Sequence, residues 1–95
     1  MQLTNSLLNS LERDFPQFIF QLDNQFLWSA RQQTISIDAN ADHCDEFTLH
    51  ELSHAVLGHK GYMSDIELIK LERDAWDYAK QKLAPKYSHT IDEEL

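Results

Sequence analysis

The sequence predicts a small α+β domain in which one helix and three short strands precede two further helices. Apolar residues recur at helical spacing near the N-terminus, alternate with other residues in the next segment, and return to helical spacing in the second half of the chain. With 95 residues, the chain is expected to form a single domain, residues 1–95, around a small core.

The first helix is predicted from four leucines at helical spacing, Leu3, Leu7, Leu8 and Leu11. It should end before Pro16, because proline lacks a backbone N–H and its ring clashes with the preceding turn.

Three strands are expected next. Phe18, Phe20 and Leu22 alternate with other residues, as in a half-buried strand. Further strands are predicted over 26–30 and 34–37, giving a three-stranded, mostly antiparallel sheet. The last strand leads directly into the next helix, so we expect its free edge to run along a cleft and to pair with an extended peptide. Ordinary solvent-exposed sheet is the alternative.

The most informative residues are His50-Glu51-Leu52-Ser53-His54, which form an HExxH pattern. Two His four residues apart lie about 40° apart around a helix and about 6 Å apart along it, so their imidazoles converge on one metal ion. Glu51 lies about 100° from His50 and about 60° from His54, so it flanks the metal without binding it. A carboxylate there can act as general base toward a water whose pKa zinc lowers to roughly 7.

The helix that carries this pattern places its apolar residues away from the two His: Leu49, Leu52, Ala55 and Val56. Asn40 or Asp42 is expected to cap its start, and Gly58 to end it. The alternative is a core helix whose two His are hydrogen-bonded and inert.

A third ligand is predicted on the following helix, which should start at the capping box of Ser64 and run until Pro85 forces Ala84 to be extended. Glu72 lies at the centre of its apolar stripe, where an unpaired carboxylate would cost several kcal/mol unless a cation or a hydrogen-bonded partner offset it. Glu67 lies on the opposite face and is expected to serve the cap. The stripe consists of Leu68, Ile69, Ala75, Trp76, Ala79 and Leu83. The alternative for Glu72 is a core residue paired with a backbone group or an Arg.

Other polar residues near the motif have weaker predicted roles. The spacing of a metzincin would require a glycine at Leu57 and a His ligand at Lys60, so that class is disfavoured. A continuing helix would point His59 away from the metal. His59 and Tyr62 are near enough to polarise a substrate carbonyl, although a surface role is expected for both. His43 is expected to be a polar residue of the first turn.

The run from His50 to His59, followed by Glu72-Arg73-Asp74-Ala75-Trp76-Asp77-Tyr78-Ala79, resembles the ImmA/IrrE-type metallopeptidases and the minimal gluzincins. The resemblance covers roughly residues 34–79 and implies a zinc peptidase with His50, His54 and Glu72 as metal ligands and Glu51 as general base. The chain departs from larger members in lacking a DNA-binding or sensory domain, which disfavours the regulatory role that those members have.

Composition limits the classes of partner and the cellular compartment that are expected. The net charge of −8 disfavours nucleic acids and anionic membranes as partners, because phosphate binding needs clustered Lys and Arg. Cys44 is the single cysteine, which suits a reducing compartment, and no signal peptide or membrane span is visible. We therefore expect a cytoplasmic monomer that acts on a peptide or protein.

The sequence thus predicts a zinc-dependent metallopeptidase. A catalytically idle zinc-binding module that docks a partner, such as a phage or host repressor, is the main alternative, and a metal-free helical adaptor is a third. The tail, residues 86–95, is expected to be a frayed acidic terminus. Alternatively it folds back and makes the enzyme latent, with His89, Asp92, Glu93 or Glu94 in the fourth zinc position.

Overall fold

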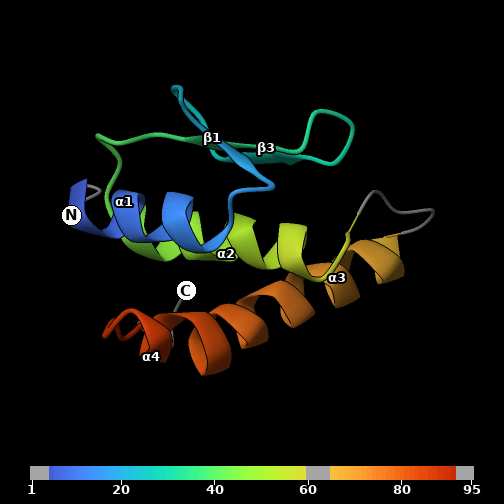
Figure 1. Cartoon of the computed structure of the whole chain (residues 1–95). Coiled ribbons are helices and arrows are strands. Elements are labelled where there is room, and N and C mark those ends of the chain that lie inside the picture. Colours follow the sequence, from blue (N-terminus) through green and yellow to red (C-terminus); the bar gives the residue numbers. More distant parts are fainter. Residues whose placement is uncertain (1–4, 60–64, 92–95) are drawn as a thin grey trace.

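A computed structural model describes residues 5–59 and 65–91 of the chain (Figure 1). The elements are, in order, α1 (Asn5–Asp14), β1 (Ile19–Leu22), β2 (Leu27–Ser29), β3 (Thr34–Ile37), α2 (Cys44–Val56), α3 (Asp65–Tyr78), the π-helical turn η1 (Ala79–Leu83) and α4 (Ala84–Lys86). The predicted α+β fold class is therefore confirmed. Within the described ranges, no helix is long and apolar enough to cross a membrane.

The elements form three layers, with α2 in the middle. Figure 1 shows the sheet on one side of α1 and α2, and the run from α3 to α4 on the other. Accordingly, α2 contacts both β2 and β3 on the sheet side and both α3 and η1 on the other. The helix that bears the HExxH pattern is thus held from two sides.

The sheet is mixed, and its order is β1-β3-β2. β3 pairs in parallel with β1 and antiparallel with β2, so the expected mostly antiparallel sheet is corrected to one pairing of each kind. The expected free edge on the last strand is also wrong, because β3 is paired on both sides. All four residues of β3 are buried whereas β1 is largely exposed, and a strand that is buried throughout belongs at the centre of a sheet.

The core lies between the inner face of the sheet and the helices. Leu7 and Leu11 of α1 are buried as predicted, and Leu3 lies outside the described residues. The buried apolar cluster consists of Leu7, Leu11, Ile35, Ile37, Cys44, Leu49, Leu52, Ala55, Ala79, Leu83, Ala84 and Ile91. Burying such side chains is the main favourable contribution to folding, at about 25 cal/mol per Å² of apolar surface.

The start of α2 differs from the prediction. Its N-cap is His43, in a left-handed conformation with φ 57°, and neither Asn40 nor Asp42 occupies that position. The His43 side chain makes no capping hydrogen bond to the backbone, but its Nδ1 lies 3.1 Å from Glu46 Oε2. Asp45 and Glu46 stand in the first turn, where the helix dipole favours negative charge.

The helical run that begins with α3 extends further than Pro85 was expected to allow. Ala84 is helical, with φ −58° and ψ −48°, and Pro85 lies in the first turn of α4, where its missing N–H costs no helical hydrogen bond. Ile69 is 59% exposed, so it is not part of the buried stripe in which it was predicted. The capping box at Ser64 lies outside the described residues.

The beginning of the tail is anchored to the domain. Tyr87 Oη donates a hydrogen bond to Asp14 Oδ2 at 2.8 Å, and Ile91 is only 5% exposed within the core. Residues 86–91 are therefore not a frayed terminus. The polar composition of the tail gave no indication that Ile91 packs in the core.

Candidate metal centre

The two His of the HExxH pattern lie on one face of α2, as predicted from their spacing. Both are buried, with 5% of His50 and 9% of His54 exposed, and their ring centroids are 4.7 Å apart. One ligand atom from each of His50, Glu51 and His54 lies within 4.8 Å of the others. These three residues form a group that could hold a metal ion.

Glu72 reaches the two His from α3. Its Oε2 lies 3.4 Å from His50 Nε2, and its Oε1 lies 2.8 Å from His54 Nε2. Two atoms bound to one tetrahedral zinc are roughly 3.3 Å apart, so the first distance already suits a shared metal while the second is a hydrogen-bond distance. The Glu72 side chain is 43% exposed, so it lies at the mouth of the site and not in the centre of a buried stripe.

The chemistry of the donor atoms fits a cation. His50 Nε2 is buried and has no hydrogen-bond partner among the described residues, although a buried polar atom normally has one. Burial, with help from neighbouring His50, lowers the pKa of His54 below its ordinary value, against the opposing effect of Glu51 and Glu72. The neutral imidazole that a metal requires is therefore favoured at His54.

Trp76 of α3 packs against the ring of His50. The two rings are stacked, with centroids 4.1 Å apart and planes at 6°. Phe47 packs edge-on against Trp76 at 5.6 Å, so an aromatic pair from α2 and α3 restricts the orientation of His50. The sequence placed Trp76 in the apolar stripe but gave no signal for this stacking.

Glu51 contacts the other nitrogen of the same imidazole. Its Oε2 lies 3.3 Å from His50 Nδ1, and its side chain is 13% exposed. A carboxylate in this position can orient the ring of a histidine that binds a metal. The predicted general base is thus close to the candidate ligands, with its carboxylate directed at His50.

His59 is turned toward His54 and not away from it. Gly58, with φ +75°, ends α2 as predicted, and His59 N–H then donates to the His54 carbonyl oxygen at 2.9 Å. This Schellman turn reverses the chain and brings His59 Nδ1 to 2.8 Å from His54 Nδ1. The expected orientation of His59 assumed a helix that continues, and it does not apply because α2 ends at Gly58. The left-handed glycine was the available signal for the reversal.

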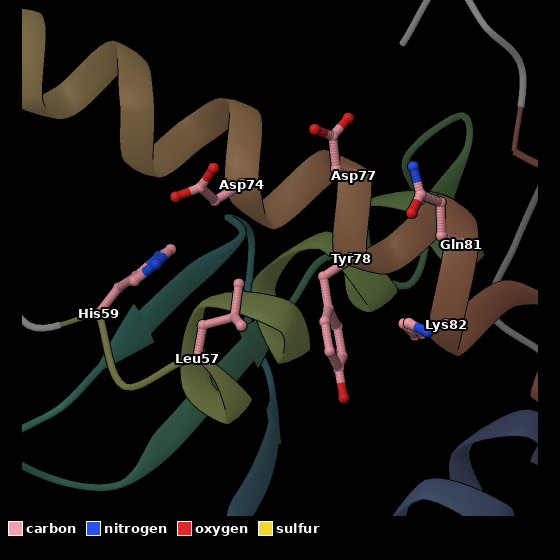
Figure 2. A pocket seen from close by; sticks show the side chains of 7 residues that line it. All are labelled: Leu57, His59, Asp74, Asp77, Tyr78, Gln81 and Lys82. Carbon is pink, nitrogen blue, oxygen red and sulfur yellow. The ribbon is translucent and has the colours of Figure 1, made fainter.

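A groove of about 420 Å³ opens beside His59. Figure 2 shows its lining: Leu57 and His59 after α2, then Asp74, Asp77, Tyr78, Gln81 and Lys82. Asp74 and Tyr78 lie roughly 160° and 120° around α3 from Glu72. The groove therefore opens on a different face of α3 from the metal centre, and His59, which lines the groove, also contacts His54.

The remaining candidates lie elsewhere. His43 caps α2, and Tyr62 lies outside the described residues. His89 Nε2 lies 3.8 Å from Asp45 Oδ2 in the first turn of α2, so the structure gives it a carboxylate partner in place of the proposed fourth metal position. The other tail candidates, Asp92, Glu93 and Glu94, are outside the described ranges.

Comparison of the chain with protein-family models, with curated proteins and with solved structures gave no match.

Proposed function

We propose that this protein is a zinc-dependent metallopeptidase of the gluzincin type, related to the ImmA/IrrE-type enzymes that its motifs resemble, and that it acts on a peptide or protein. The observation that carries the proposal is the convergence of His50, His54 and Glu72 from two helices, with Glu51 beside them. Three protein ligands leave one position open for chemistry, as is usual in catalytic zinc sites.

Each residue has a distinct role in this proposal. His50, His54 and Glu72 hold the ion, and Trp76 fixes the plane of His50. Zinc bound there would lower the pKa of a water molecule and polarise the scissile carbonyl. Glu51 would take the proton of the attacking water and deliver it to the leaving amine. To do so, its carboxylate must turn from His50 Nδ1 toward the substrate.

The position of Glu51 also favours a second candidate function. Because its carboxylate lies 3.3 Å from His50 Nδ1, it can serve as an outer partner that orients a ligand, and this role needs no catalysis. Under this alternative the chain is a catalytically idle zinc-binding module that docks a partner protein.

The variant Glu51→Gln separates the two functions, because the amide keeps the shape of the side chain but cannot accept the water's proton. The metallopeptidase proposal expects zinc binding within about threefold of the wild type and a loss of hydrolysis by at least about a hundredfold. The assay is cleavage of a broad peptide library followed by mass spectrometry, with zinc content measured on the same samples. Asp74→Asn, a matched loss of charge away from the ligands, should keep both properties.

Two outcomes would count against peptidase activity. If zinc-loaded wild-type protein cleaves nothing, and Glu51→Gln instead weakens zinc binding, the binding module is favoured. If Glu51→Gln hydrolyses peptides as fast as the wild type, the base lies elsewhere or the activity is a contaminant.

A further inference from the structure

We infer that His59 is a positioning residue of the metal centre: its Nδ1 accepts a hydrogen bond from His54 Nδ1–H and so holds His54 in the tautomer whose Nε2 binds metal. The inference rests on the proposed metal site but not on peptidase activity. It applies equally to an enzyme and to a zinc-binding module.

The geometry is built by the backbone. The Schellman turn at Gly58 fixes the start of the loop, and Trp28 Nε1–H from β2 donates to the His59 carbonyl oxygen at 2.8 Å. His59 is thus tied to both α2 and the sheet through main-chain atoms. The imidazole ring of His59 contacts that of His54. The two Nδ1 atoms are 2.8 Å apart and the ring centroids are 5.1 Å apart.

The number of protons on the two imidazole rings determines the tautomer of each. Two neutral imidazoles that face each other through Nδ1 can share only one proton, so one ring donates and the other accepts. Without metal, His54 Nε2–H can donate to Glu72 Oε1 at 2.8 Å, and His54 Nδ1 then accepts from His59. When Nε2 binds metal, the proton must be on His54 Nδ1, and His59 becomes the acceptor.

His59 suits this task because an imidazole can either donate or accept at Nδ1. A carbonyl would only accept, and an ammonium would only donate. When His59 accepts, its own proton is on Nε2, on a ring that also lines the groove of Figure 2. The His59 proton on Nε2 then lies on the groove side of the two rings, so no unpaired N–H is buried beside His54.

Two variants test the inference. In His59→Leu the side chain keeps a similar volume but loses the acceptor, and zinc affinity should fall about 10- to 100-fold, the usual cost of removing an outer partner. In His59→Asn the amide oxygen can stand close to the position of Nδ1, and affinity should return to within about threefold of the wild type. Both variants keep the main-chain bonds to Trp28 and His54. Affinity is measured by competition with a chromophoric chelator, and folding by melting of the metal-free proteins.

A third measurement uses the wild type alone. Long-range ¹H–¹⁵N spectra of the imidazoles should show the proton on Nδ1 of zinc-loaded His54 and on Nε2 of His59. The inference is overturned if His59→Leu binds zinc as tightly as the wild type, if His59→Asn loses as much affinity as His59→Leu, or if zinc-loaded His54 carries its proton on Nε2. A wild type that binds no zinc would instead refute the proposed metal site, which is a separate result.

Discussion

Replacement of Glu72 by alanine tests the proposed third metal ligand, which lies on α3. The Glu72 side chain is 43% exposed, and its contacts with His50 and His54 are partly screened by solvent. Exposed ion pairs contribute about 0–1 kcal/mol, so Glu72→Ala should change the metal-free free energy of unfolding by less than about 1 kcal/mol. The large effect should appear only with zinc.

Linkage gives the size of that effect. At a free zinc concentration of 100 times the wild-type Kd, binding stabilises the folded state by about 2.7 kcal/mol, which corresponds to a rise in Tm of roughly 11–22 °C for a domain of this size. Loss of an outer partner already weakens metal binding 10- to 100-fold, so loss of a ligand should weaken it at least about 100-fold. At the same zinc concentration, Glu72→Ala should then gain at most about 0.4 kcal/mol, or about 2–3 °C.

The assay is differential scanning fluorimetry with a zinc titration, followed by direct measurement of bound zinc. Glu67→Ala is the matched control, because Glu67 is an exposed residue of the same helix and lies about 140° around it from Glu72. It should keep the full zinc-dependent rise. The reasoning is refuted if Glu72→Ala shows the wild-type rise in Tm, and more strongly so if Glu67→Ala loses it.

Two further predictions concern stability. The hydrogen bond from Tyr87 to Asp14 should stabilise the fold between about pH 4 and pH 10. Arg13 and Tyr87 hold the pKa of the Asp14 carboxyl below its ordinary value, so this stability is lost as pH falls through the pKa of Asp14 in the folded protein. Burial and Asp14 raise the pKa of Tyr87, so the stability is also lost as pH rises above the ordinary tyrosine pKa. Tyr87→Phe should therefore lower the free energy of unfolding at pH 7, and lower it by less at pH 3. Urea titrations at both pH values measure the two losses. Equal losses would contradict a contribution from the hydrogen bond to ionised Asp14. Ile91→Ala should cost about 2–4 kcal/mol, since Ile91 is 5% exposed in the core, and unchanged urea unfolding would show that the tail does not pack.

The local parts of the site were predictable because helical geometry depends only on sequence separation. The four-residue spacing of His50 and His54 sets their angle on α2, and helical periodicity singled out Glu72 on α3, although its side chain contacts the two His from an exposed position and not from a buried stripe. The end of α2 at Gly58 was likewise readable from a single residue.

What the sequence by itself determined is therefore the set of candidate ligands and the helix, strand and helix order. Only the tertiary structure decided that β3 is the central strand, that Trp76 stacks on His50, and that His59 returns to His54. Strand order depends on which strand is buried from both sides, and ring contacts between elements depend on how those elements pack. Neither is a function of spacing along the chain, because each is fixed by the burial of residues that are distant in sequence.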